Sequence, residues 1–318
     1  MSGPTQANAD TMLQHVSRFA EIGDRSQVNP IGQQLARAYI TETLNAFGWN
    51  VTAEPVEIRN AITITDSAKG AFPLTYRRRL HGENLIATRT ERTQIVIGAH
   101  YDTVAGSPGA DDNGSGLAVL LELARILPPT APVELAFYDM EEIGHQGSLT
   151  AARRAKNAGT KLMICLDAIG FYREEPHSQN LPFGSSMLLG PAARQIHACD
   201  DRGNFTLLIH RATTTAAAAE ITEAAARAGL DIITVRDPRP DGIRGRIATF
   251  AAAPLSNLDR SDHASYWANG IPALLLTGTG NLRNPHYHQA TDTPETLDYR
   301  RIQALADALS TVTIATSP

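Results

Sequence analysis

Cysteine and long apolar runs are both scarce in this sequence. Cys165 and Cys199 are the two cysteines in 318 residues, too few for a disulfide scaffold. Cys165 lies in the apolar run 162–166, which predicts a buried thiol rather than a crosslink. No run approaches the roughly 18 apolar residues that a membrane-spanning helix needs. These absences favour a chain that folds around an ordinary hydrophobic core.

A strong charge of either sign is also lacking. The 28 basic and 33 acidic side chains leave a net charge of −5. This mild acidity gives no electrostatic reason to expect nucleic acid or an anionic membrane as a partner. The N-terminus has no basic segment followed by an apolar stretch, so a cytoplasmic protein is expected, or a secreted one if a signal was removed. The sequence does not predict the oligomeric state.

Hydrophobic periodicity predicts an α/β fold. A content of 42% hydrophobic and 19% charged residues is typical of a soluble globular enzyme. Helical spacing occurs at residues 8–22, 31–47, 115–127, 145–157, 191–200, 214–228, 262–269 and 297–315. Short apolar runs predict strands at residues 49–58, 84–88, 94–99, 133–138, 161–166, 231–235 and 272–276.

The order of these elements indicates a mostly parallel, mixed central sheet with helices on both faces. A single domain over residues 1–318 is expected, with an elaborating section at about 171–261. Residues 59–82 are expected to be an irregular segment, in which Arg77, Arg78 and Arg79 lie in a solvated loop. In the second helix, Asn29 is the expected cap, and Leu35, Ala38, Ile40, Leu44 and Phe47 form the expected apolar face.

Polar side chains follow several of the predicted strands. His100 and Asp102 come after strand 94–99, and the pair Glu141-Glu142 comes after strand 133–138. Asp167 ends strand 161–166, and His288 lies in a loop beyond strand 272–276. Ligands of open α/β sheets bind outside the carboxyl ends of the strands. The sequence therefore predicts that two histidines and several carboxylates meet at one edge of the sheet.

A glycine-rich loop at residues 109–116 runs from this edge into a helix. One interpretation is an ordinary turn in which Asp and Asn cap the helix. The other is a loop that presents a carboxylate from a fixed backbone, which suits a ligand that bridges two metal ions. Phosphate binding is disfavoured because the Lys-Ser/Thr of a Walker motif is missing.

The candidate ligands are imidazoles and carboxylates, with no thiolate among them. This set suits zinc in a hydrolytic site and is also compatible with Mn²⁺ or Co²⁺. Two such ions about 3.5–4 Å apart would share a water, lower its pKa and polarise a scissile carbonyl. A nearby free carboxylate would then accept the proton of the water.

Six segments in this order resemble the co-catalytic di-zinc aminopeptidase family, which also contains glutamate carboxypeptidase II-like enzymes and glutaminyl cyclases. They are His100-Tyr-Asp102, Gly109-Ala-Asp-Asp112-Asn-Gly-Ser-Gly116, Glu141-Glu142-Ile-Gly144, Leu166-Asp167, Ser261-Asp262-His263 and His286-Tyr-His288-Gln-Ala-Thr-Asp292-Thr. The resemblance implies two zinc ions per chain.

The resemblance also implies a role for each residue. His100 and Asp167 would bind one zinc, Glu142 and His288 the other, and Asp112 would bridge them. Glu141 would be the general base, acting on a water between the metals, and Asp102 would accept a hydrogen bond from His100. Asp262 and His263 would line the substrate pocket or support the metals, although Asp262 also suits a helix cap. Asp292 would support His288 or cap a turn, and His286 would be a neighbour of the ligands.

Several functions are compatible with this resemblance. An aminopeptidase acting on peptides leads, and a carboxypeptidase or an amidase of small amino-acid conjugates is the main alternative. A carboxylate clamp for these substrates could come from Arg236, Arg239, Arg244, Arg246 and Arg260, which also suit solvated loops. A one-zinc glutaminyl cyclase is a third possibility. A non-catalytic binding module is disfavoured, because all five ligand positions and Glu141 are filled.

Overall fold

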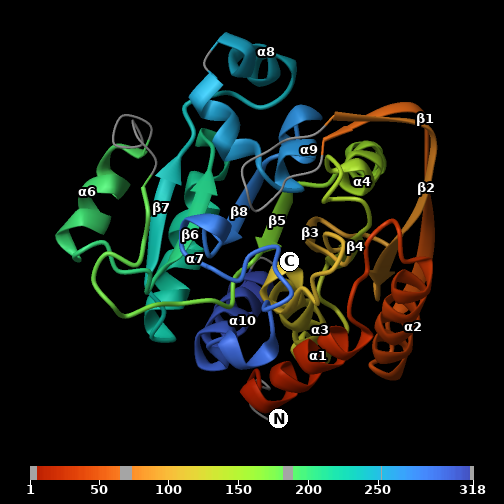
Figure 1. The fold of residues 1–318 in the computed structure, drawn as a ribbon, viewed down its shortest axis with the longest axis horizontal. Coiled ribbons are helices and arrows are strands. Elements are labelled where there is room, and N and C mark those ends of the chain that lie inside the picture. Colours follow the sequence, from red (N-terminus) through yellow and green to blue (C-terminus); the bar gives the residue numbers. More distant parts are fainter. Residues whose placement is uncertain (1–5, 65–73, 182–188, 252, 316–318) are drawn as a thin grey trace.

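The computed structural model describes residues 6–64, 74–181, 189–251 and 253–315. Across these residues, eight strands form one sheet in the order β1-β2-β4-β3-β5-β8-β6-β7 (Figure 1). The strands are β1 (Asn50–Ile64), β2 (Leu74–Thr88), β3 (Ile95–His100), β4 (Val133–Tyr138), β5 (Leu162–Asp167), β6 (Thr206–His210), β7 (Ile232–Arg236) and β8 (Ala273–Thr277). Neighbours from β4 to β8 pair in parallel, whereas β1–β2, β2–β4 and β6–β8 are antiparallel. The predicted mixed α/β sheet is confirmed.

Helices cover both faces of the sheet. One core cluster joins the sheet to α1 (Ala9–Ile22), α2 (Pro30–Ala46), α3 (Gly116–Ile126), α7 (Thr215–Arg227) and α10 (Tyr299–Ala315). A second cluster joins the opposite face to α4 (Gln146–Ala158), α6 (Pro191–Ala198) and α9 (His263–Ala268). A further helix, α8 (Ile243–Ala251), lies near α9 at the top of Figure 1. None of the helices in the described part of the chain is long and apolar enough to cross a membrane.

The central strands are apolar on both sides because both sides are covered. In β5, Ile164 and Leu166 belong to the first cluster, and Met163 and Cys165 belong to the second. The alternation follows from the two-residue period of a strand. It explains why the sequence shows these strands as continuous apolar runs. The predicted burial of the Cys165 thiol is confirmed.

The structure differs from the sequence-based prediction at residues 59–82. The described parts of this region belong to a long hairpin, in which β1 pairs with β2 from Asn50 opposite Thr88 to Ile64 opposite Leu74. The predicted irregular loop is therefore wrong, although the three arginines at 77–79 are exposed as expected. The strand β6 and the helix α8 were not predicted. Leu35 and Ala38 of α2 face solvent, and Gln33 and Ala36 take part in the buried face instead.

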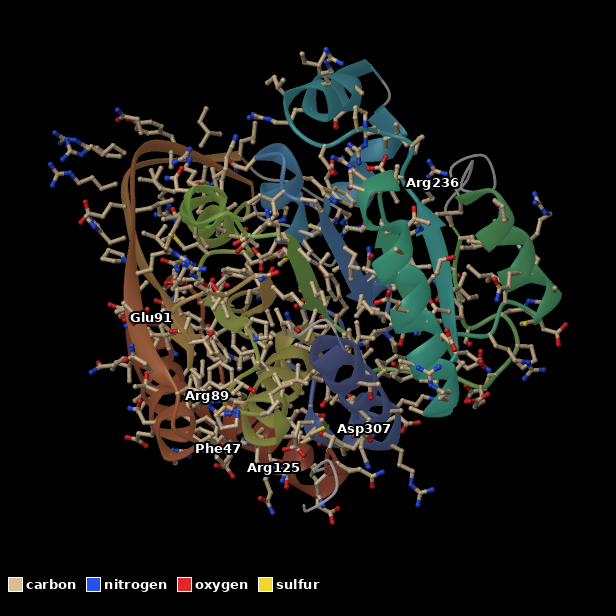
Figure 2. All side chains as sticks on the ribbon, turned by 180° about the vertical axis from the view of Figure 1, so that it is seen from behind. Phe47, Arg89, Glu91, Arg125, Arg236 and Asp307 are labelled. Carbon is tan, nitrogen blue, oxygen red and sulfur yellow. The ribbon has the colours of Figure 1, made fainter. Side chains whose placement is uncertain are left out.

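Arg89, just after β2, ties two helix ends to the sheet (Figure 2). Its guanidinium donates hydrogen bonds to the carbonyls of Phe47, Ala124 and Leu127, at the carboxyl ends of α2 and α3. It also stacks 4.5 Å from the ring centre of Trp49. The last carbonyls of a helix have no partner within the helix, so this one cation satisfies groups from both.

Candidate metal centre

The carboxyl ends of β3, β4 and β5 meet at one edge of the sheet and carry the predicted ligands. His100 ends β3, Asp167 ends β5, and Glu141 and Glu142 follow β4 in a turn. His100 Nε2 lies 3.2 Å from Asp112 Oδ1 and 3.8 Å from Asp167 Oδ1. These three side chains therefore form one potential metal subsite.

A second subsite adjoins the first across Asp112. His288 Nε2 lies 3.0 Å from Asp112 Oδ2 and 3.2 Å from Glu142 Oε2. Neither ring nitrogen of His288 has a hydrogen-bond partner among the described residues, and the same is true of the buried Glu142 Oε1. Short nitrogen–oxygen distances without hydrogen bonds suit side chains that share a metal ion. The ligand atoms of His100, Asp112 and Glu142 all lie within 4.8 Å of one another.

The glycine-rich loop holds Asp112 between the two histidines. Gly109 has a φ of 57°, and a Cβ at this position would lie 2.4 Å from the Asp112 carbonyl oxygen. At Gly116 a Cβ would lie 2.4 Å from Asn113 Oδ1. Gly109 therefore requires glycine, because of its positive φ and the close backbone, whereas at Gly116 the Asn113 side chain would have to shift. The peptide bond between Asp112 and Asn113 is cis.

Arg25 was not singled out by the sequence, yet it anchors the same loop. The side chain is fully buried and donates hydrogen bonds to the carbonyls of Pro108 and Gly109, 2.7 and 3.1 Å away. It also donates to the carbonyl of Tyr101, next to His100. Burial lowers the pKa of Arg25 to about 10, and nearby carboxylates such as Asp292 oppose this effect, so the group stays charged at neutral pH. An isolated arginine after a helix carries no signal for this role.

Asp102 supports the site in a different way from the one predicted. His100 Nδ1 contacts the backbone carbonyl of Asp102 at 3.1 Å, and the carboxylate lies farther away at 3.5 Å. The carboxylate instead accepts hydrogen bonds from the backbone N–H groups of Glu141 and Glu142, at 3.1 and 3.2 Å. Asp102 thus links the ends of β3 and β4, and fixes the turn that carries both glutamates.

The electrostatics of the centre favour added positive charge. Burial alone would lower the pKa of His288, but Glu142 and Asp112 raise it to about 11. Burial followed by the charge of Asp112 raises the pKa of Glu142 to about 8. Burial also raises the pKa of Glu141 well above its ordinary value, and Asp167 adds to this effect. Five carboxylates around two imidazoles are thus costly to ionise together, and divalent cations would relieve this repulsion.

Asp262 and His263 are fully buried. Asp262 makes no side-chain capping hydrogen bond, so the alternative prediction of a helix cap is wrong. Both of its carboxylate oxygens have no hydrogen-bond partner in the described structure. His263 Nε2 contacts the Leu258 carbonyl at 2.8 Å, and its ring packs edge-on against Trp267. Their assignment to a substrate pocket remains a prediction.

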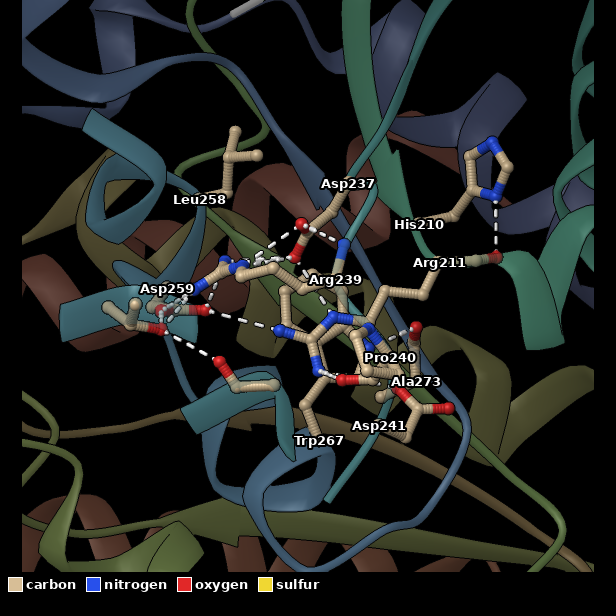
Figure 3. A network of polar contacts seen from close by, with 12 residues as sticks. His210, Arg211, Asp237, Arg239, Pro240, Asp241, Leu258, Asp259, Trp267 and Ala273 are labelled. Atoms are coloured by element: carbon tan, nitrogen blue, oxygen red, sulfur yellow. Dashed lines mark hydrogen bonds and ion pairs between the residues drawn. The ribbon is translucent and has the colours of Figure 1, made fainter. Parts of the chain in front are cut away.

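A buried ion-pair network within residues 171–261 supports the segment that carries Asp262 and His263 (Figure 3). The Arg211 guanidinium stacks 3.9 Å from the ring centre of Trp267 and donates a 2.9 Å hydrogen bond to Asp237. Arg239 pairs with Asp237 and with Asp259, which is three residues before Asp262. Arg239 is therefore engaged within the protein and is not available as a carboxylate clamp.

The structure also adds one residue to the site and separates another from it. His145, which the sequence did not single out, lies with Nε2 3.1 Å from Glu141 Oε1. His286 instead contacts Thr291 Oγ1 through its Nδ1 at 3.0 Å, and packs against Phe171. The choice of His288 rather than His286 as the candidate ligand is consistent with this arrangement.

Comparisons with known proteins identify relatives of this chain by sequence. The Escherichia coli (strain K12) protein YfbL is 34% identical over 234 residues, which cover 69% of this chain and 65% of that protein. A probable leucine aminopeptidase of Trichophyton verrucosum (strain HKI 0517) is 28% identical over 257 residues, 73% of this chain and 56% of its own. The chain thus spans less than two thirds of the length of these relatives.

Solved structures share the fold at low sequence identity. The zinc aminopeptidase of Bacillus subtilis has a TM-score of 0.64 at 16% identity, covering 97% of this chain and 94% of that one. Glutaminyl cyclase of Porphyromonas gingivalis has a TM-score of 0.64 at 20% identity, covering 97% of this chain and 98% of that one.

The model of peptidase family M28 matches residues 84–313, a range that contains the whole candidate centre. The chain therefore belongs to peptidase family M28.

Proposed function

We propose that this protein is a zinc-dependent aminopeptidase that hydrolyses N-terminal peptide bonds. The observation that carries the proposal is the position of Asp112, whose two carboxylate oxygens face different histidines. One oxygen is 3.2 Å from His100 and the other is 3.0 Å from His288. Each histidine has a further carboxylate beside it, so the ligand set divides into two halves with Asp112 shared.

The buried donor set fits two zinc ions. When bound, zinc would polarise the scissile carbonyl and make a water more acidic. His100 and Asp167 would hold one ion, Glu142 and His288 the other, and Asp112 would bridge. The orphaned nitrogen atoms of His288 and the orphaned Glu142 Oε1 support this fit, since unpaired polar atoms are costly in a buried site.

Glu141 is the group placed to move the proton. Its side chain is nearly buried, and Asp102 fixes its backbone through the Glu141 N–H. As the oxygen of water bonds to the carbonyl carbon, Glu141 would accept the proton of the water. It would then pass this proton to the leaving amine as the carbon–nitrogen bond breaks, which restores the carboxylate for the next cycle.

A panel of dipeptides distinguishes this function from its alternatives. Each dipeptide is supplied with a free amine and as its N-acetyl form to the zinc-loaded protein, with and without a chelator. Chelator-sensitive cleavage of the free-amine set alone is expected. Cleavage of the acetylated set would indicate a carboxypeptidase or an amidase of amino-acid conjugates. Failure to cleave either set, with two zinc ions bound, would contradict the aminopeptidase proposal.

Cyclisation is the second function that needs a direct test, because glutaminyl cyclases share the fold. The zinc content per chain and the release of ammonia from an N-terminal glutamine peptide are measured together. Two zinc ions and no cyclisation are expected. One zinc ion with pyroglutamyl product would replace the hydrolase proposal with a cyclase.

A further inference from the structure

His145 lies against the proposed general base at the turn that begins α4. Its Nε2 atom is 3.1 Å from Glu141 Oε1. The backbone N–H of His145 donates a 3.0 Å hydrogen bond to the Glu141 carbonyl, and His145 has a left-handed φ of 57°. This conformation is uncommon for residues other than glycine and persists where the surrounding structure fixes it. The turn thus brings the imidazole back to the carboxylate four residues earlier.

A second carboxylate acts on the same imidazole. Burial lowers the pKa of His145, and the carboxylates of Asp262 and Asp167 oppose this effect. Asp262 is fully buried, and neither of its oxygens has a hydrogen-bond partner in the described residues. His145 therefore has Glu141 in direct contact and the unpartnered Asp262 close by. Carboxylates in both positions favour an imidazole that presents an N–H group to them.

Glu141 needs such a partner because its surroundings are crowded with negative charge. The carboxylates of Asp167, Asp102 and Asp112 all act on it. Rotation away from these groups would relieve the repulsion but would also remove the base from the reacting water. The 3.1 Å contact of His145 Nε2 at Oε1 opposes that rotation. The contact involves Oε1, which leaves Oε2 as the carboxylate oxygen for the proton.

We propose that His145 is a positioning residue, which donates a hydrogen bond to Glu141 Oε1 and holds Oε2 toward the attacking water. This inference rests on the proposed function, since it assigns a partner to the proposed base. The His145 side chain is 27% exposed, so it is not a core residue. Its replacement should therefore alter turnover more than folding.

Two variants of the zinc-loaded protein separate positioning from packing. His145→Gln retains an N–H donor, whereas His145→Leu has similar bulk and no donor. His197→Leu is the matched control, because His197 forms the same i,i+4 pair with Asp201 on the surface, at 2.7 Å. Zinc content, melting temperature, kcat and KM are measured for all three. Partners that orient catalytic groups typically account for 10–100-fold effects.

The expected result is wild-type zinc content in every variant. His145→Leu should lower kcat about 10–100-fold and change KM by less than about threefold. His145→Gln should recover most of this loss, and His197→Leu should behave like wild type. Unchanged kcat in His145→Leu, or equal losses in the Gln and Leu variants, would overturn the proposal.

Crystal structures of the zinc-loaded wild type and His145→Leu provide a readout that needs no activity. Glu141 should occupy one rotamer in the wild type and several, or a rotated one, in the variant. The same single rotamer in both would overturn the positioning role. If the wild type cleaves no amide, the proposed function fails, but the rotamer of Glu141 still decides whether His145 holds the carboxylate.

Discussion

The carboxylate of Asp292 holds the backbone of Asp112, although 180 residues separate them in the sequence. Asp292 Oδ2 accepts a hydrogen bond from the Asp112 N–H at 3.1 Å, and Oδ1 accepts one from the Asp111 N–H at 2.9 Å. The Asp292 carbonyl also accepts a hydrogen bond from Ala110. Asp292 therefore supports the loop of Asp112, and no hydrogen bond or ion pair joins its side chain to His288, the partner considered from the sequence.

Asp292→Ala should weaken zinc binding without removing any ligand. The substitution leaves the N–H groups of Asp111 and Asp112 without their acceptor, so the loop can move away from the two histidines. A loss of roughly 10–100-fold in zinc affinity is expected, as for other groups that orient metal ligands. Competition with a chromogenic chelator measures it. Unchanged affinity in a folded variant would show that glycines and Arg25 suffice to hold the loop.

Glu141→Gln should separate metal binding from turnover. The amide cannot accept the proton of the water, but it preserves the size of the side chain and leaves all five proposed ligands in place. We expect two zinc ions per chain and a decrease in kcat of about 10²–10⁴-fold. Mass spectrometry of bound metal and steady-state kinetics test this together. Near-normal turnover with zinc confirmed would remove Glu141 from its role.

The ligand positions could be predicted because they depend on local rules. His100, Glu142 and Asp167 each lie at or after a strand that is largely apolar, and the carboxyl ends of parallel strands meet at one edge. The glycine spacing of the loop is equally local. The supporting contacts could not be predicted in this way. Arg25 and Asp292 act on backbone groups about 80 to 180 residues away, and the hydrophobic periodicity of a sequence does not indicate such contacts.

The errors in the fold also have physical causes. The outer part of the β1–β2 hairpin is a two-stranded ribbon whose side chains are largely exposed, so it lacks the strict alternation that indicates a half-buried strand. The short strand β6 has five buried residues and no flanking motif. His145 gave no signal, since a single histidine at a helix start is common. Its role depends on a left-handed turn that only the structure reveals.

Asp112 and its neighbour Asp111 form a matched pair for testing the bridge. Both side chains are buried in the same loop, but Asp111 accepts hydrogen bonds from the Gly170 N–H and the Asn284 amide, away from the histidines. Asp112→Ala should reduce zinc below two ions per chain, whereas Asp111→Asn should retain two. Elemental analysis after dialysis measures both. Two tightly bound ions in Asp112→Ala would contradict the bridging assignment.

His15 on α1 should make stability depend on pH outside the metal centre. Its ring is buried, Nδ1 contacts the Tyr39 hydroxyl at 2.7 Å, and Nε2 has no hydrogen-bond partner among the described residues. Burial lowers its pKa from 6.5 to about 4. Between these values the unfolded chain binds the proton and the folded chain does not. The stabilisation from neutral His15 is therefore complete above pH 6.5 and is lost as the pH falls toward 4.

The size of this loss follows from the shift and can be isolated with one variant. At about 1.4 kcal/mol for each pKa unit, the wild type should lose on the order of 3 kcal/mol of unfolding free energy through His15. His15→Gln keeps a polar partner for Tyr39 but does not titrate, so it should lose that much less between pH 7 and pH 4. His177→Gln, at a largely exposed position, should follow the wild type. Urea unfolding at several pH values measures all three. Parallel curves for wild type and His15→Gln would mean that the pKa of His15 is the same in the folded and unfolded chains, because only a difference between these two values gives stability this dependence on pH.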